Sequence, residues 1–197
     1  MIIQRELSSS YITLLNELER KLLINNLFIY EELQKVCEMK YGVGNVIPKN
    51  INGIYPVYGA NGVVSIANEY NNSDSVIVGH IGTVGKVIWA PGKHYVTYNG
   101  TIVKSKNNNK LVNKFIYYFL LTQNLEKFKK GSQPFLSIKD FNKILIPIPT
   151  IEVQNKIVEI LDRLETYIQD IKNGLPKEIE ERKKQYKYYL NKLLNFD

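Results

Sequence analysis

The last quarter of the chain, residues 151–194, carries apolar residues at the spacing of a coiled coil. From Ile157 to Leu175 the apolar positions alternate between steps of four and three, the 3.5-residue repeat of a helix that packs against another helix. A single helix of this length would extend roughly 66 Å at about 1.5 Å per residue, which exceeds what a domain of about 150 residues covers. The pattern therefore predicts a helical arm that pairs with a second chain. The alternative is a helix that packs back on its own domain.

The repeat slips once, because the step from Leu175 to Ile179 is a second step of four. Gly174 and Pro176 lie at the slip, where glycine suits the end of a helix and proline suits the first turn of the next. The arm is thus either one continuous helix or two helices end to end. We call its predicted contact positions the seam, which consists of Ile157, Leu161, Leu164, Ile168, Ile171, Leu175, Ile179, Tyr186, Leu190 and Leu193.

Composition limits the class of protein and the kind of partner. The net charge of +7 and the pI near 9.2 favour a polyanionic partner such as DNA, although an AT-rich genome would also enrich lysine and asparagine. No apolar run approaches the length of about 20 residues that a bilayer span needs, and the N-terminus lacks a signal-peptide pattern, so we expect a cytoplasmic protein. Cys37 is the single cysteine, which excludes an internal disulfide and predicts a buried apolar side chain.

Periodicity predicts an α+β fold of three parts: an amphipathic helix over 1–25, a β-rich domain over 26–150, and the helical arm over 151–197. A short helix is expected over 28–36, followed by a strand over 37–41. Turn-rich segments at 71–74 and 91–92 separate short β-branched runs in the middle of the chain. Those runs are 54–58, 63–67, 75–78, 84–89 and 101–104.

The part after these runs is predicted to be helical, with helices over 111–122, 125–130 and 137–143. Ser137 and Asp140 have the spacing of a capping box at the start of the last helix. A strand over 144–146 is expected to end at Pro147.

The residues that catalysis requires do not occur in the necessary patterns. The chain has no Asn/Asp-Pro-Pro-aromatic sequence and no glycine-rich cofactor loop, which an adenine methyltransferase would need. Glu38 and Lys40 have a nuclease-like spacing without a close acidic partner, and Gly85-Lys86-Val87 lacks the hydroxyl of a phosphate-binding loop. Neither His80 nor His94 has the neighbours of a triad or a metal site. We therefore expect a non-catalytic protein without a metal.

Polar loops instead suit a nucleic-acid surface. Three glycines in residues 79–85 place backbone amides at the tip of a strand-turn-strand, where His80 either contacts phosphate or a base, or caps the turn. Asn99 and Gln133 have side chains that match an adenine edge, although each of these turns is also ordinary loop chemistry. The predicted DNA-binding residues are Lys40, Tyr41, Lys49, Asn61, His80, Thr83, Lys86, Thr97, Tyr98, Asn99, Ser132, Gln133 and Lys139.

Several of these stretches occur together in an order that resembles a known family. They are Tyr55–Gly62, Gly79–Gly85, Gly131–Leu136, Ile146–Pro149 and Gln154–Leu161, with Gly174–Ile179 and Gln185–Tyr189 in the arm. In this order they resemble a target-recognition domain and helical spacer of the specificity subunits of type I restriction-modification systems. His80 departs from the family, since many relatives carry arginine there.

The resemblance implies the organisation of the complex. Full-length subunits of this family carry two recognition domains and two spacers that pair antiparallel, so a chain with one of each is expected to be a half-subunit that pairs with a copy of itself. Separate modification and restriction subunits would carry out methylation and cleavage and would bind S-adenosylmethionine, Mg and ATP, with no cofactor on this chain.

The sequence thus predicts a homodimeric specificity subunit that reads a bipartite palindromic site in double-stranded DNA. Two alternatives stay open: the chain is the recognition segment of a fused restriction enzyme, or it is a helical adaptor that does not bind DNA. The bases it reads are not predicted, because single changes in loops alter readout without altering the fold.

Overall fold

The structure is a computed structural model that describes residues 29–44, 48, 52–128, 135–166, 174 and 184. The chain divides into two compact units, Met1–Asn155 and Lys156–Asp197. The predicted helix over 1–25 and most of the arm beyond residue 166 lie outside the described residues. Gly174 is itself helical, and the two alternatives for the arm, one continuous helix or two helices, both stay open. No helix in the described ranges has the length and hydropathy that a bilayer span requires.

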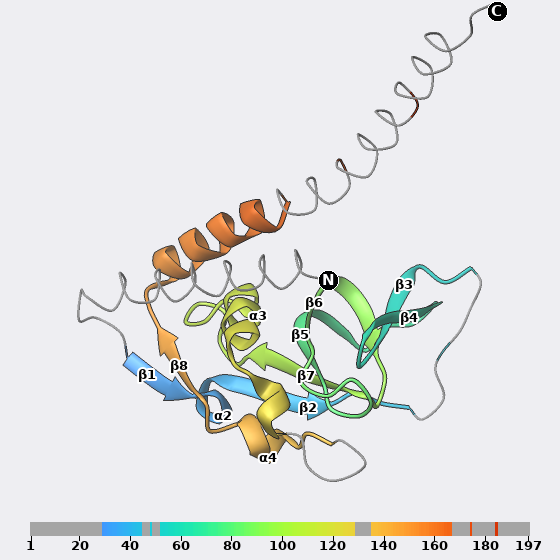
Figure 1. The fold of residues 1–197 in the computed structure, drawn as a ribbon, viewed down its shortest axis with the longest axis horizontal. Coiled ribbons are helices and arrows are strands. Elements are labelled where there is room, and N and C mark those ends of the chain that lie inside the picture. Colours follow the sequence, from blue (N-terminus) through green and yellow to red (C-terminus); the bar gives the residue numbers. More distant parts are fainter. Residues whose placement is uncertain are drawn as a thin grey trace, which may run out of the picture. The chain divides into compact units, whose positions relative to one another are not determined.

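A six-stranded sheet forms the centre of the first unit, and its strand order is β2-β7-β5-β6-β3-β4 (Figure 1). Neighbouring strands are antiparallel except for β3 and β6, which pair in parallel. β-branched and aromatic residues dominate these strands, as their propensity for extended structure leads one to expect. The strands are β2 (Cys37–Tyr41), β3 (Tyr55–Gly59), β4 (Gly62–Ala67), β5 (Asn72–Gly79), β6 (Val87–Val96) and β7 (Gly100–Ser105).

A second, two-stranded sheet pairs the two ends of the segment 29–148. β1 (Ile29–Glu32) runs antiparallel to β8 (Leu145–Ile148), and Tyr30 lies opposite Pro147. The helical elements are α2 (Leu33–Val36), α3 (Asn113–Thr122), the 3-10 helix η1 (Leu125–Phe128) and α4 (Ile138–Phe141). Together with the six-stranded sheet, these elements confirm the predicted α+β class.

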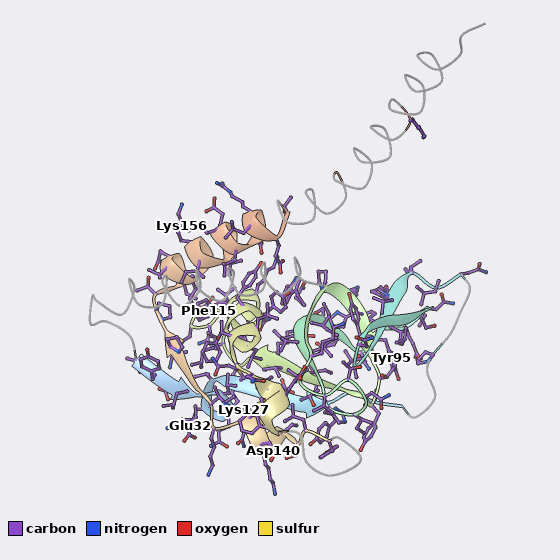
Figure 2. The ribbon with its side chains drawn as sticks, viewed as in Figure 1. Glu32, Tyr95, Phe115, Lys127, Asp140 and Lys156 are labelled. Atoms are coloured by element: carbon purple, nitrogen blue, oxygen red, sulfur yellow. The ribbon has the colours of Figure 1, made fainter. Side chains whose placement is uncertain are left out.

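The longest of these helices, α3, packs against β5, β6 and β7. It buries Phe115, Ile116, Tyr118 and Leu120 (Figure 2). Each fully buried side chain of this size stabilises the fold by roughly 1.5–3 kcal/mol. The helix therefore covers the sheet with a continuous apolar face.

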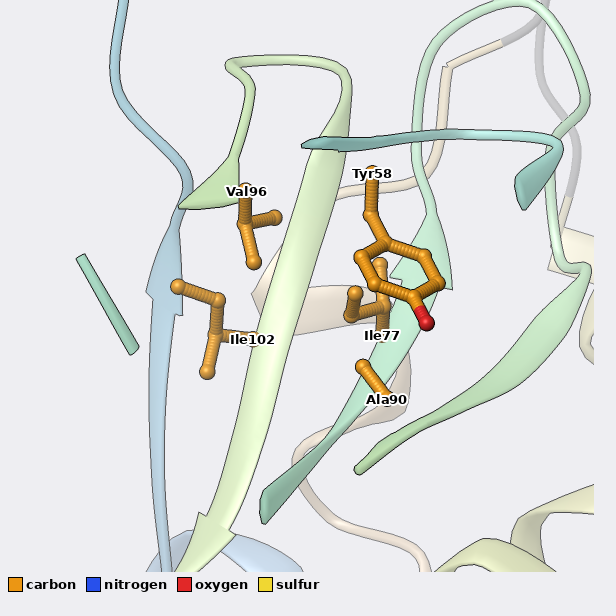
Figure 3. Close-up of a cluster of buried hydrophobic side chains, with 5 residues drawn as sticks. All are labelled: Tyr58, Ile77, Ala90, Val96 and Ile102. Carbon is orange, nitrogen blue, oxygen red and sulfur yellow. The ribbon is translucent and has the colours of Figure 1, made fainter. Parts of the chain in front are cut away.

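A cluster of apolar side chains lies within the six-stranded sheet (Figure 3). Tyr58, Ile77, Val96 and Ile102 come from four different strands, and Ala90 comes from the middle of β6. All five are nearly or fully buried. Four consecutive strands, β7-β5-β6-β3, thus share one core, and the sheet curves around it.

Two predicted turns prove to be the bend that curves this sheet. Residues 72–74 of β5 lie opposite residues 91–94 of β6, and the register shifts around Asp74. Asp74 has φ 43 and its carboxylate accepts the Gly92 amide hydrogen at 2.8 Å. Asn71 pairs with the Val96 backbone through both its amide nitrogen and its amide oxygen. The prediction of turns was wrong because asparagine and aspartate side chains here take the place of ladder hydrogen bonds in a bulge.

Two other sequence-based boundaries also differ from the structure. Residues 29–32 form β1 rather than part of a helix, because their partner β8 is remote in the sequence. Pro147 lies inside β8 rather than ending it, which a two-stranded sheet tolerates because each strand has an unpaired edge. Other local predictions are confirmed: the Asp140 carboxylate accepts the Ser137 backbone N–H at 2.8 Å, and Cys37 is buried. Burial raises the pKa of the Cys37 thiol to about 12.

Because backbone atoms pack closely around Gly79, we expect the addition of one methyl group there to lower the free energy of unfolding strongly. A Cβ at Gly79 would lie 2.7 Å from the Ala60 carbonyl oxygen and closer still to that of Thr83, whereas a Cβ at Gly59 would first meet the movable Val64 side chain at 3.2 Å. We expect Gly79→Ala to lower the free energy of unfolding by about 2 kcal/mol or more, and Gly59→Ala to lower it by less than about 1 kcal/mol. Urea denaturation of both variants measures this, and equal losses would contradict the packing argument.

Candidate nucleic-acid interface

The glycine-rich motifs of the sequence meet at one end of the six-stranded sheet. The Lys86 ammonium, at the end of the β5–β6 loop, donates to the carbonyl and side-chain oxygens of Asn61 in the β3–β4 turn, at 2.8 and 2.6 Å. Gly79 closes the same loop, since its N–H donates to the Lys86 carbonyl at 2.8 Å and its carbonyl accepts the Gly85 N–H at 2.8 Å. Two motifs that are about 20 residues apart in the sequence are therefore joined in one surface.

Two further motifs join the same surface through the backbone of His80. Its N–H donates to the Asn99 carbonyl at 3.1 Å, and its carbonyl accepts the Leu136 N–H at 3.0 Å. Ile81 and Phe135 form an isolated antiparallel bridge beside these bonds. We call this surface, with the start of α4, the loop end, which comprises residues 60–61, 80–86, 97–99 and 135–139.

Four rings pack together inside the loop end, and we call them the aromatic cluster: Tyr41, His80, Tyr98 and Phe135. The His80 ring centroid lies 4.6 Å from that of Tyr41, 5.4 Å from that of Tyr98 and 5.7 Å from that of Phe135. The last two contacts are edge-to-face, with interplanar angles of 80° and 90°. The Tyr41 hydroxyl accepts the Ile138 amide hydrogen at 3.2 Å, which fixes the inner wall of the cluster to α4.

His80 is fully buried and neutral at pH 7. Burial lowers the pKa of its imidazole from 6.5 to about 4. Its Nδ1 lies 3.2 Å from Thr101 Oγ1, whereas its buried Nε2 has no hydrogen-bond partner among the described residues. A buried polar atom without a hydrogen-bond partner lowers the stability of a fold by roughly 1–3 kcal/mol. The packing of the aromatic rings around His80 offsets part of this loss.

The exposed side chains of the loop end are of the types that bind nucleic acid. Lys86 presents a positive charge for phosphate, Thr83 a hydroxyl, and Asn61 and Asn99 amide groups. Tyr98 and Phe135 are 42% and 39% exposed and add apolar surface. Lys139 is exposed on α4, directly after the residue whose amide bonds Tyr41.

The structure places other predicted DNA-binding residues less favourably. Thr97 is buried and its hydroxyl donates to the Tyr58 carbonyl at 3.2 Å, so it and His80 hold the loops rather than face a ligand. Lys40 is exposed but pairs with Glu38 at 3.3 Å, which offsets its charge. Lys49, Ser132 and Gln133 lie outside the described residues, so their roles stay predictions.

Phe135 was not among the predicted contact residues. It belongs to the Gly131–Leu136 motif, but only the polar residues of that motif were predicted to bind, because their side chains form hydrogen bonds. No local pattern in the sequence distinguishes an exposed Phe135 from a buried one.

A serine-histidine pair lies elsewhere in the sheet. His94 Nε2 is 2.9 Å from Ser75 Oγ, and its Nδ1 is 2.8 Å from the Gly92 carbonyl oxygen. Burial lowers the pKa of His94, and the Gly92 carbonyl opposes this effect. Both side chains are fully buried, so the pair supports the β5–β6 bend and is closed to a substrate. Within the described ranges, no three His, Cys, Asp or Glu side chains gather as a metal site would require.

Residues 151–166 are helical, and a buried glutamine fastens the start of that helix. The Gln154 side chain accepts the Val112 N–H at 2.8 Å and donates to the Lys110 and Pro149 carbonyls at 2.9 and 2.8 Å. Farther along, Arg163 forms an ion pair with Glu159 at 2.6 Å.

Only three of the predicted seam residues fall within the described helix. Leu161 is buried, and Ile157 and Leu164 are partly buried. The other seam residues lie outside the described part of the chain: Ile168, Ile171, Leu175, Ile179, Tyr186, Leu190 and Leu193.

The lowered pKa of His80 predicts a loss of stability in acid. The unfolded chain binds a proton at this residue near pH 6.5, whereas the folded chain binds it only near pH 4, so folding weakens as the pH falls through this window. Between pH 7 and pH 4.5 the free energy of unfolding of the parent chain should fall because His80 takes up a proton on unfolding. In His80→Phe, which cannot titrate, this fall should be smaller by about 2 kcal/mol. Urea denaturation at both pH values tests this, and parallel losses in both proteins would contradict it. His94 is present in both and cancels.

Comparison with known proteins places these motifs in a family. Residues 30–181 match the family described as type I restriction modification DNA specificity domain. The specificity subunit of the type I restriction enzyme MpnII from Mycoplasma pneumoniae is 32% identical over 174 residues, which cover 84% of this chain and 52% of that protein. The EcoR124I/EcoR124II specificity subunit from Escherichia coli is 41% identical over 88 residues, 42% of this chain and 22% of that protein.

The fold has a solved counterpart in the crystal structure of the S subunit of a type I restriction-modification system from M. genitalium. The TM-score is 0.63 at 19% identity, over 87% of this chain and 46% of that chain. The chain spans about half the length of the curated relatives it matches. Because the matched segment covers most of the sequence and contains the loop end, the chain belongs to the family of type I restriction-modification DNA specificity domains.

Proposed function

We propose that this chain recognises a specific DNA sequence as a half-sized specificity subunit of a type I restriction-modification complex. The observation that carries the proposal is the convergence of the separate glycine-rich motifs into one exposed loop end, in a chain that belongs to this family. Loops held by a rigid sheet are the usual location of binding residues. The loop end is therefore the surface that meets DNA.

The side chains of the loop end divide into two kinds of contact. Lys86 and Lys139 are exposed and positively charged, so they bind phosphates and position the domain on the duplex. Asn61 uses its side-chain oxygen to hold Lys86, so it supports that phosphate contact. Asn99 is exposed at the tip of its turn and has the amide group that reads base edges.

Two copies of the chain pair antiparallel through the seam of the arm. The heptad spacing of the arm supports this pairing. A two-fold axis between two identical recognition domains presents the same half-site twice in opposite orientation. The recognised DNA is then an interrupted palindrome whose gap is set by the arm.

The catalytic steps belong to other subunits. In this proposal the chain directs separate methyltransferase subunits and, through them, a restriction subunit, all in the cytoplasm. S-adenosylmethionine, Mg and ATP bind to those partners and none binds to this chain. Purified chain incubated with Mg and DNA is expected to leave the DNA intact.

A second possibility is that the chain is the recognition segment of a larger fused restriction enzyme. A helical adaptor without DNA binding is the third. Cleavage of DNA by the purified chain would support the fused enzyme, and absence of salt-dependent DNA binding would support the adaptor.

Removing positive charge from the loop end is expected to weaken DNA binding for all sequences alike. The double variant Lys86→Gln, Lys139→Gln should bind less tightly and should flatten the slope of log affinity against log salt by about 0.9 for each phosphate that it no longer neutralises. Fluorescence anisotropy over a range of salt concentrations measures both quantities.

The matched control removes two lysines at the opposite end of β7. Lys106 and Lys110 follow Ser105, away from the Gly100 end that joins the loop end. The double variant Lys106→Gln, Lys110→Gln should keep the parental slope. Equal flattening in both variants would show that overall charge, rather than the loop end, binds the DNA.

Charges in the seam are expected to separate the two chains. The double variant Leu164→Glu, Ile168→Glu should be a monomer by light scattering, because an unpaired charge buried between helices costs several kcal/mol. In binding selections it should prefer a single half-site in place of the interrupted palindrome. The control Thr166→Glu, Gln169→Glu puts the same charge outside the seam and should stay dimeric. An unchanged mass of the first variant would refute the seam.

A further inference from the structure

The turn between β6 and β7 presents the side-chain amide of Asn99 to solvent. Asn99 is exposed, and its backbone carbonyl accepts the His80 N–H at 3.1 Å. Within the described part of the chain, its side chain makes no hydrogen bond. The backbone is therefore fixed while the amide keeps one acceptor and two donors for a ligand.

Two aromatic rings lie beside this turn and have surface to spare. Tyr98 and Phe135 pack edge-to-face on His80 and yet remain 42% and 39% exposed. His80 itself is fully buried beneath them. The two rings thus form an apolar patch at the surface, next to an amide, in the part of the molecule that carries Lys86.

The support beneath these three residues is rigid. The backbone of His80 bonds Asn99 on one side and Leu136 on the other, and its Nδ1 lies 3.2 Å from Thr101 Oγ1. Tyr98 and Phe135 are therefore fixed relative to Asn99 through one buried residue. Side chains held in this way lose little conformational entropy when they bind, which favours specific contacts.

We propose that Tyr98, Asn99 and Phe135 read one A·T base pair through the major groove, an inference that rests on the proposed function. The Asn99 amide donates to adenine N7 and accepts from adenine N6, and the rings of Tyr98 and Phe135 contact the 5-methyl group of the paired thymine. His80 is a positioning residue that holds the three readers together.

The chemistry of the base pairs favours this choice over G·C. In the major groove, only an A·T pair presents both an amide-complementary edge and a methyl group. Guanine presents two acceptors, which suit a free arginine or lysine. Within the loop end, the Lys86 ammonium already donates to two oxygens of Asn61.

The test starts from the DNA site that the full-length chain selects from a randomised library. In that site, each thymine is replaced in turn by uracil, which removes only the methyl group, and each adenine by 7-deazaadenine, which removes only N7. At one A·T pair of the half-site, each replacement should lower the affinity by about tenfold. Asn99→Ala should lose the sensitivity to 7-deazaadenine, and Phe135→Ala should lose most of the sensitivity to uracil.

Matched controls come from exposed residues far from the loop end. Asn109→Ala lies in the loop after the opposite end of β7, and Leu145→Ala replaces an exposed apolar residue of β8. Both should keep the parental sensitivities. If Phe135→Ala does not fold, Phe135→Leu takes its place. The loss of affinity of the parent chain for uracil-containing DNA tests the contact to the thymine methyl group without any variant.

The outcomes separate this inference from the proposed function. A selected site in which no A·T pair responds to either replacement would overturn the reading by these three residues and leave DNA recognition intact. Unchanged sensitivity to 7-deazaadenine in Asn99→Ala would do the same. Failure to select any sequence would overturn both.

Discussion

The approach of backbone to backbone at Gly79 is the constraint on which the loop end depends. A side chain at this position would collide with the carbonyl groups of Ala60 and Thr83, so two loops come together only because position 79 has none. The Gly79 N–H and carbonyl then bond Lys86 and Gly85, which closes the β5–β6 loop. His80 follows directly and extends the contact to the remaining loops. The missing side chain of Gly79 therefore permits the β3–β4 turn and the β5–β6 loop to meet.

Much of the fold could be predicted because its signals are local. β-branched runs became strands near their predicted positions, and Ser137 with Asp140 began α4 as the capping box requires. The glycine motifs of the candidate site were also visible in the sequence, since glycine clusters mark tight turns. That these motifs would meet was not predicted, because no local pattern encodes which turns are neighbours in space.

The features that could not be predicted depend on partners remote in the sequence. Asn71 is a residue type typical of turns, yet its side-chain amide forms two hydrogen bonds with the backbone of Val96 beside a bulge of the curved sheet. His80 and Thr97 are polar residues in loops, which favours exposure, yet both are buried by contacts with remote segments, Tyr41 and Phe135 for His80 and Tyr58 for Thr97. Burial of the imidazole lowers its pKa, so the only polar ring in the motif serves as a neutral packing residue.

The loop end consequently contains two kinds of residue: those that hold its loops together and those whose side chains face solvent. Gly79, His80 and Thr97 make their contacts inside the domain, and altering them would disturb several loops at once. Asn99 and Thr83 face solvent, and their side chains contribute little to the core. A change in an outward residue therefore alters the ligand surface at small cost in stability, since exposed substitutions usually stay within about 0.5 kcal/mol. This division lets one scaffold present different ligand surfaces, because the exposed positions between the glycine motifs contribute little to the stability of the fold.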